Sequence, residues 1–149
     1  MSDRALQILA ALDGGSESET ILAALMPLAR SASCELTLFQ VADGPESAGT
    51  ARAYLTKVQG ALALHRIQSR VDVAIGDPGP VLLERLGSGT FDFGAMTTHG
   101  RRGLTRVLMG SVAETVVRSA EIPLFINRPD AKIGDWKKIV VALDGSKEA

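Results

Sequence analysis

The sequence is poor in the residues that build disulfide frameworks, metal sites and strongly charged surfaces. It has one cysteine, Cys34, and two histidines among 149 residues, so it offers neither an intrachain disulfide nor a patterned Cys/His zinc site. Sixteen Lys and Arg stand against seventeen Asp and Glu, which gives a formal charge of −1. This balance argues against nucleic acid or an anionic membrane as a partner.

Long apolar segments and export signals are also lacking. The apolar runs, such as residues 139–143, are far shorter than the roughly 20 residues that cross a bilayer. Residues 1–12 do not have the order of basic, apolar and small residues that is typical of a secretory signal. With 46% hydrophobic residues over one domain length, we expect a single globular unit in a reducing cytoplasm.

Short apolar segments alternate with segments of helical periodicity. The pattern predicts strands over residues 6–12, 35–42, 70–75, 91–96 and 123–127, with a helix between each strand and the next. Ser16 with Glu19, and Ser111 with Glu114, have the spacing of a capping box at a helix start. Short turns between alternating strands and helices favour a Rossmann-like α/β fold, in which helices cover both faces of a five-stranded parallel sheet.

The end of the chain repeats its beginning. Residues 139–148 match residues 8–17 at six of ten positions, at an offset of 131 residues. One domain length between the copies predicts a tandem protein: a first unit over residues 1–129, a linker over 130–136, and the first strand of a truncated second unit over 137–149. The alternative is that an apolar strand ending in Asp-Gly recurs by chance.

Polar residues and glycines gather where the predicted strands end. Asp13 follows the first strand, residues 41–43 end the second, and residues 97–100 end the fourth. Ligands of open parallel sheets bind outside the carboxyl ends of the strands. Glycines let backbone amides approach an anion, and the helix that starts at Ser111 supplies unpaired N–H groups with partial positive charge. The pattern therefore predicts a phosphate-binding site.

The same residues carry a resemblance to the universal stress protein family. In that family a glycine, two residues, a second glycine and nine residues precede Gly-Ser or Gly-Thr, and Gly100, Gly110 and Ser111 fit this spacing. Asp13-Gly14, His99 and Ile122-Pro123 support the resemblance, which covers residues 5–128. It implies an adenine nucleotide alpha hydrolase-like fold, ATP as the ligand with magnesium left open, and a homodimer through the last strand at residues 123–127.

The resemblance also implies a role for individual residues. Asp13 would face the ribose, and the backbone of Val41 would face the adenine. The phosphates would be lined by His99, Gly100, Gly110, Ser111 and Val112, and the set is completed by Ala11, Met96, Thr97 and Ala113.

Three of these residues have a second interpretation. Thr97 stands where the family has its first motif glycine. In an ordinary strand conformation its side chain is tolerated or bonds the ribose, whereas a positive φ would strain it. Asp13 could be only a turn residue, and Ser111 only a helix cap.

Motifs of common nucleotide-using enzymes are missing. The sequence has no Gly-x-x-x-x-Gly-Lys-Ser/Thr loop, no Gly-x-Gly-x-x-Gly at the first helix and no Gly-x-Ser-x-Gly elbow. No general acid and base pair stands out, which leaves at most a weak ATPase that uses Asp13 or His99. We interpret the chain as an ATP-binding stress-response module and not a metabolic enzyme. The alternative is a dimerising interaction module that needs no nucleotide.

Overall fold

Strands and helices alternate along the chain, as the sequence predicts. The computed structural model describes residues 4–98, 109–132, 134 and 140. Within these residues the order of elements is β1 (Leu6–Ala11), α1 (Ser16–Ser31), β2 (Cys34–Ala42), α2 (Pro45–Leu64), β3 (Gln68–Ile75), α3 (Pro78–Leu86), β4 (Phe93–Thr97), α4 (Ser111–Ser119) and β5 (Leu124–Asn127).

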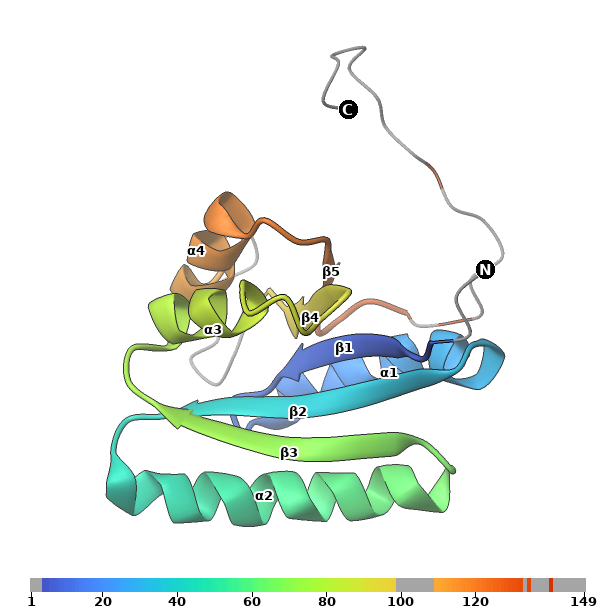
Figure 1. Cartoon of the computed structure of the whole chain (residues 1–149), viewed down its shortest axis with the longest axis horizontal. Coiled ribbons are helices and arrows are strands. Elements are labelled where there is room, and N and C mark those ends of the chain that lie inside the picture. The colour runs from blue at the N-terminus through green and yellow to red at the C-terminus, as the bar shows by residue number, and fades with distance from the viewer. Residues whose placement is uncertain (1–3, 99–108, 133, 135–139, 141–149) are drawn as a thin grey trace.

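The strands form one parallel sheet in the order β3-β2-β1-β4-β5 (Figure 1). On one side of β1, Ile8 is in register with Leu36 of β2, and on the other side with Phe93 of β4. The chain therefore builds the sheet outward from β1 in one direction and then in the other. The switch point, where such sheets bind ligands, lies between β1 and β4. This confirms the predicted doubly wound architecture.

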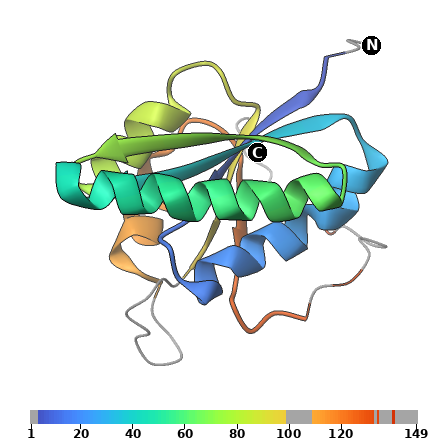
Figure 2. The same ribbon diagram turned by 90° about the horizontal axis from the view of Figure 1, so that it is seen from below.

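Both faces of the sheet are covered at its centre, so the central strand β1 is a nearly continuous apolar run. Helices α1 and α2 cover one face and α3 and α4 the other (Figures 1 and 2). Successive residues of β1 supply opposite faces: Ile8 packs with Leu25 and Leu55, while Leu9 packs with Leu82 and Val116. Full burial of a side chain of this size contributes about 1.5–3 kcal/mol.

Two helix starts differ from the prediction. The N-cap residues of α1 and α4 are Gly15 and Gly110, and neither helix has a side-chain cap hydrogen bond. The predicted capping boxes are therefore wrong, because each serine lies one position inside the helix and not at its cap. Glu114 instead forms a 2.9 Å ion pair with Arg118, one turn further along α4.

The predicted linker and second unit fall largely outside the described residues. Of residues 130–149, the structure describes only 130–132, 134 and 140, so the tandem arrangement stays a prediction. Among the described helices, none combines the length and apolar character that would let it cross a membrane.

Candidate functional site

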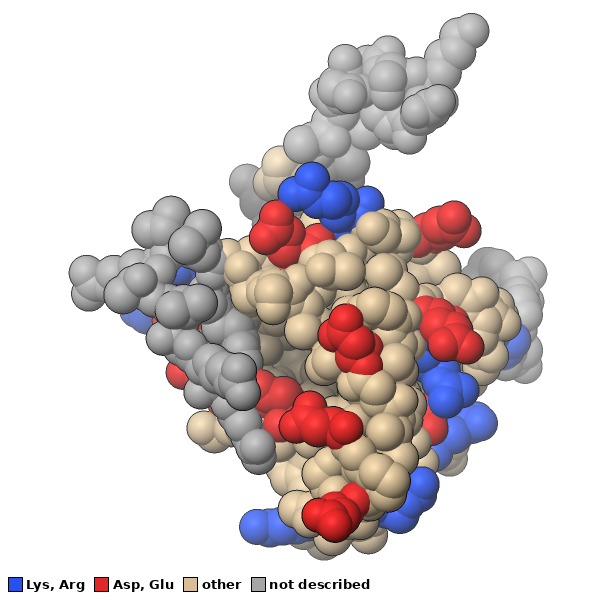
Figure 3. Space-filling model, turned by 90° about the vertical axis from the view of Figure 1, so that its left-hand side faces the viewer, with Lys and Arg blue, Asp and Glu red and all other residues tan. Residues whose placement is uncertain are grey.

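The switch point gathers the ends of β1 and β4 and the starts of α1 and α4. Figure 3 looks onto this carboxyl edge of the sheet, where acidic side chains are prominent. Asp43 and Asp77 are exposed there, in the connections that follow β2 and β3, and Glu46 is exposed in the first turn of α2. These negative charges would repel an anionic ligand, so such a ligand would depend on positive groups to bind at this edge. The start of α4 supplies a partial positive charge there.

Asp13 orders the tight turn between β1 and α1. Its Oδ1 accepts a hydrogen bond from the Gly15 N–H at 2.8 Å, and its own N–H donates to Ser18 Oγ at 3.2 Å. Between them, Gly14 has a φ of 81°, a conformation that favours glycine. Asp13 therefore does act as a turn residue. Its carboxylate is half-buried and follows β1 at the switch point, where the ribose contact stays a prediction.

Gly110 brings the start of α4 against the end of β4. The Thr98 N–H donates to the Asn127 carbonyl at 2.9 Å, and the Gly110 N–H donates to the Thr98 carbonyl at 2.7 Å. A Cβ at position 110 would lie 3.1 Å from that same carbonyl oxygen. The glycine therefore favours this close approach, and its N–H is engaged within the protein.

The next three N–H groups of α4 belong to Ser111, Val112 and Ala113. They are the first helical positions and have no intrahelical acceptor, and no acceptor among the described residues lies against them. The Glu114 N–H is the first to bond in the helical manner, to the Gly110 carbonyl at 2.9 Å. These groups, with the partial positive charge of the helix start, can hold a phosphate or carboxylate.

Thr97 has ordinary strand geometry. It is the last residue of β4, is 6% exposed and is in register with Asn127 of β5. Among the described residues, the only non-glycine with a positive φ is Arg66, so the strained interpretation of Thr97 is wrong. By strand alternation its side chain shares the α1 face with Ala95, whereas Met96 packs toward α4. The threonine Cβ thus lies on the opposite face from the α4 donors.

The backbone groups of Val41 point toward the β1 side of β2, at the carboxyl edge of the sheet. Phe39 accepts from the Leu12 N–H at 2.8 Å on the β1 side, and Ala42 accepts from the Gly76 N–H at 3.1 Å on the β3 side. Because backbone groups alternate along a strand, those of Val41 point to the β1 side, beyond the last residue of β1, Ala11.

Ser18 is part of the site, although the sequence analysis did not single it out. It is 3% exposed, and its Oγ also donates to the Gly15 carbonyl at 2.8 Å. The available signal was its position on the apolar stripe of α1, three residues before Ile21 and four before Leu22.

Two predicted site residues, His99 and Gly100, lie outside the described residues, as does the rest of segment 99–108. The structure therefore brings together nine members of the predicted set at or beside the switch point: Ala11, Asp13, Val41, Met96, Thr97, Gly110, Ser111, Val112 and Ala113. Within the described part of the chain, no group of three or more His, Cys, Asp or Glu could hold a metal ion.

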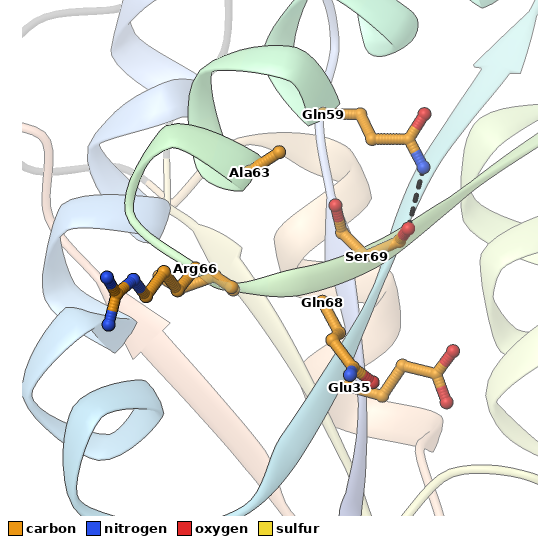
Figure 4. A pocket seen from close by; sticks show the side chains of 7 residues that line it. Glu35, Gln59, Ala63, Arg66, Gln68 and Ser69 are labelled. Atoms are coloured by element: carbon orange, nitrogen blue, oxygen red, sulfur yellow. Dashed lines mark hydrogen bonds between the residues drawn. The ribbon is translucent and has the colours of Figure 1, made fainter.

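An open depression of about 600 Å³ lies at the other, amino edge of the sheet (Figure 4). It is bounded by the end of α2 and the starts of β2 and β3, and one wall is closed by Gln59, whose Nε2 donates to the Ser69 carbonyl at 2.6 Å. Its charged residues include Glu35, which is paired with Arg70 at 2.7 Å. This depression is remote from the switch point and is not the predicted site.

Comparison with known proteins agrees with this architecture. The model of the universal stress protein family matches residues 6–128. Among curated proteins, none matches the chain.

Several solved structures have the same fold at low sequence identity. A universal stress protein in complex with cAMP is 17% identical, with a TM-score of 0.69 over 85% of this chain and 98% of that one. The universal stress protein from Archaeoglobus fulgidus in complex with dAMP is 14% identical, with a TM-score of 0.65 over 84% and 98%. A family protein from Arabidopsis thaliana with AMP bound is 17% identical, with a TM-score of 0.63 over 85% and 93%.

Proposed function

The chain belongs to the universal stress protein family, and we propose that it is a cytoplasmic regulatory module that binds an adenine nucleotide, with ATP as the predicted ligand. The observation that supports the proposal is the start of α4, which follows β4 beside the switch point and whose first N–H groups, those of Ser111, Val112 and Ala113, have no intrahelical acceptor. The AMP, dAMP and cAMP complexes of similarly folded proteins support an adenine nucleotide as the ligand class.

The proposed arrangement divides the nucleotide among three strand ends. Phosphate oxygens accept from the α4 N–H groups and the Ser111 hydroxyl. The ribose lies near the Asp13 turn, and the adenine bonds the outward backbone groups of Val41. Magnesium would offset the acidic side chains along this edge.

Thermal unfolding with and without nucleotide tests the proposal. A ligand that binds only the folded state at one hundred times its Kd stabilises that state by about 2.7 kcal/mol, or about 5–10 °C in Tm for a chain of this length. We expect ATP or AMP to raise the Tm, GTP to raise it less, and mass spectrometry of freshly purified protein to detect a released adenine nucleotide. No shift with any adenine nucleotide at millimolar concentration, with magnesium present, would refute the proposal.

Ser111→Pro examines the main donor directly. Proline at the first helical position lacks the N–H but fits the helix, and the preceding Gly110 already has the extended φ and ψ of −61° and 152° that proline requires. Ser16→Pro is the matched control, because Ser16 also follows an extended glycine at a helix start. We expect Ser111→Pro to weaken ATP binding about tenfold or more, because it removes both the N–H and the hydroxyl that would donate to the charged phosphates. Equal affinities of the two variants would contradict the assignment.

The alternative function is dimerisation without nucleotide, which the position of β5 favours. This strand lies at the edge of the sheet, and the carbonyls of Pro123 and Asn127 face β4, so the Ile126 N–H points outward. Ile126→Pro removes that donor, and Ile126→Val keeps it. If β5 mediates a homodimer, light scattering should show a monomer for the proline variant alone.

A further inference from the structure

Tyr54 connects α2 to the start of α1. Its hydroxyl donates to Glu19 Oε1 at 3.0 Å, across 35 residues of sequence. The Tyr54 side chain packs against the buried cluster on the face of the sheet that α1 and α2 cover. This packing restricts the position of the hydroxyl that bonds Glu19. Glu19 lies in the first turn of α1, and its N–H is directed at the Gly15 carbonyl at 3.4 Å.

The residue before Glu19 holds both sides of the Asp13 turn. Ser18 Oγ accepts from the Asp13 N–H at 3.2 Å and donates to the Gly15 carbonyl at 2.8 Å. The Asp13 carboxylate closes the same turn on the Gly15 N–H at 2.8 Å. Any rotation of the first turn of α1 therefore changes the direction in which the Asp13 carboxylate points.

The groups of this turn also affect the pKa of the Tyr54 phenol. Burial raises the pKa of Tyr54 well above its ordinary value of 10, and the hydrogen bond to Glu19 and the charges of Glu19 and Asp13 raise it further, while the Ser18 hydroxyl lowers it. The phenol therefore remains a hydrogen-bond donor throughout the physiological pH range.

We propose that Tyr54 is a positioning residue for the nucleotide site: through Glu19 it fixes the first turn of α1 and so the orientation of Asp13. The inference rests on the proposed function and extends it to α2, which supplies none of the predicted nucleotide contacts.

Substitutions of Tyr54 and Glu19 test this role. Tyr54→Phe removes only the hydroxyl, and we expect it to weaken ATP binding about three- to tenfold in calorimetric titration. Glu19→Ala should weaken binding similarly, while Glu19→Gln, which keeps an acceptor oxygen, should restore most of the affinity. Thr56→Val is the control on the exposed side of the same helix, since the Thr56 hydroxyl bonds only the Arg52 carbonyl.

A double-mutant cycle separates positioning from general destabilisation. If Tyr54 acts through Asp13, Tyr54→Phe should have no further effect on affinity in an Asp13→Ala background. Additive losses would overturn the inference, as would a Tyr54→Phe protein that binds ATP like the wild type while Asp13→Ala does not.

Hydrogen exchange in the nucleotide-free protein distinguishes this inference from the proposed function. Tyr54→Phe should speed exchange of the Asp13 and Gly15 amides several-fold and leave that of Leu9, in the sheet interior, unchanged. If the wild type binds no nucleotide, the proposed function fails, and the exchange rates still decide whether Tyr54 holds the turn. Unchanged exchange at Asp13 and Gly15 would overturn that hold.

Discussion

The two edges of the sheet use polar side chains in different ways. At the amino edge, charged side chains from different segments pair with one another: Arg70 with Glu35, and Arg4 with Asp92. At the carboxyl edge, Asp13 and Ser18 instead bond the backbone of their own turn. At the amino edge these pairs offset opposite charges within the chain. At the carboxyl edge the side chains fix a turn, and the first N–H groups of α4 have no recorded acceptor among the described residues.

This difference indicates where function is to be sought. Two of the groups that line the depression at the amino edge already have partners within the chain: Gln59 bonds the Ser69 carbonyl, and Glu35 bonds Arg70. At the carboxyl edge the donors proposed for a ligand are the first backbone N–H groups of α4, which need no side-chain reorganisation on binding. Substitutions at one edge can test this difference when they are compared with matched positions elsewhere or with the wild type.

The largest expected effect is that of a side chain at Gly110. Its Cβ would lie 3.1 Å from the Thr98 carbonyl oxygen, so Gly110→Val requires a shift of a few tenths of an ångström between the start of α4 and the end of β4. We expect nucleotide affinity to fall about 30-fold or more, the equivalent of roughly 2 kcal/mol. Isothermal titration with ATP measures it.

Gly44→Val is the matched control for Gly110→Val. Gly44 is likewise the N-cap of a helix, α2, but a Cβ there meets nothing within 4 Å. Both variants place a poor N-cap residue at a helix start, so both lose some stability. Nucleotide affinity should fall in Gly110→Val alone, and an equal fall in Gly44→Val would show that the start of α4 has no special role.

Thr97→Gly is expected to have an intermediate effect. The threonine is 6% exposed in a strand, so its loss removes buried contacts and adds backbone freedom, at a cost of about 1–2 kcal/mol of unfolding free energy. Greater backbone freedom at the end of β4 also reaches Thr98, whose carbonyl accepts from the Gly110 N–H at the start of α4. ATP affinity should therefore fall about two- to fivefold. Urea unfolding and ATP titration measure the two quantities.

Thr37→Gly in β2 separates these contributions. Thr37 is also 6% exposed but is in register with Leu9 of β1 and Arg70 of β3 and is not part of β4, so we expect a similar loss of stability and unchanged affinity. Tighter ATP binding by Thr97→Gly would instead mean that the threonine obstructs the site where the family has glycine.

Sequence patterns predict the parts of this molecule that depend on local or periodic signals. The apolar run of β1 and the Asp13 turn predict a buried strand and its end, and both are confirmed. The capping boxes failed because an N-cap is defined by backbone angles, which Ser16 and Ser111 do not reveal. Element boundaries shifted by a few residues for the same reason.

Contacts between distant elements could not be predicted. The bond from Tyr54 to Glu19 depends on how α2 packs beside α1, and no spacing in the sequence encodes that packing. The side on which Thr97 points depends on the register of β4. His99, Gly100 and the repeat at residues 139–148 remain predictions.

The smallest expected effect is that of removing the Arg70–Glu35 pair at the amino edge. The hydrogen bond from Arg70 holds the pKa of Glu35 below its ordinary value of 4.5. Exposed pairs of this kind contribute only about 0.5 kcal/mol. We expect Arg70→Gln to lower the unfolding free energy by about this amount at pH 7 and to leave ATP affinity unchanged.

The effect of Arg70→Gln on stability should depend on pH. Since the pKa of Glu35 is lowered in the folded protein, the stabilisation is present above the ordinary value of 4.5 and is lost as the pH falls through the lowered pKa. The difference in stability between Arg70→Gln and the wild type should therefore shrink progressively below pH 4.5 and also in high salt, as urea unfolding can measure. A fall in ATP affinity with Arg70→Gln would contradict the separation of the two edges, because it would show that the ion pair at the amino edge affects ligand binding.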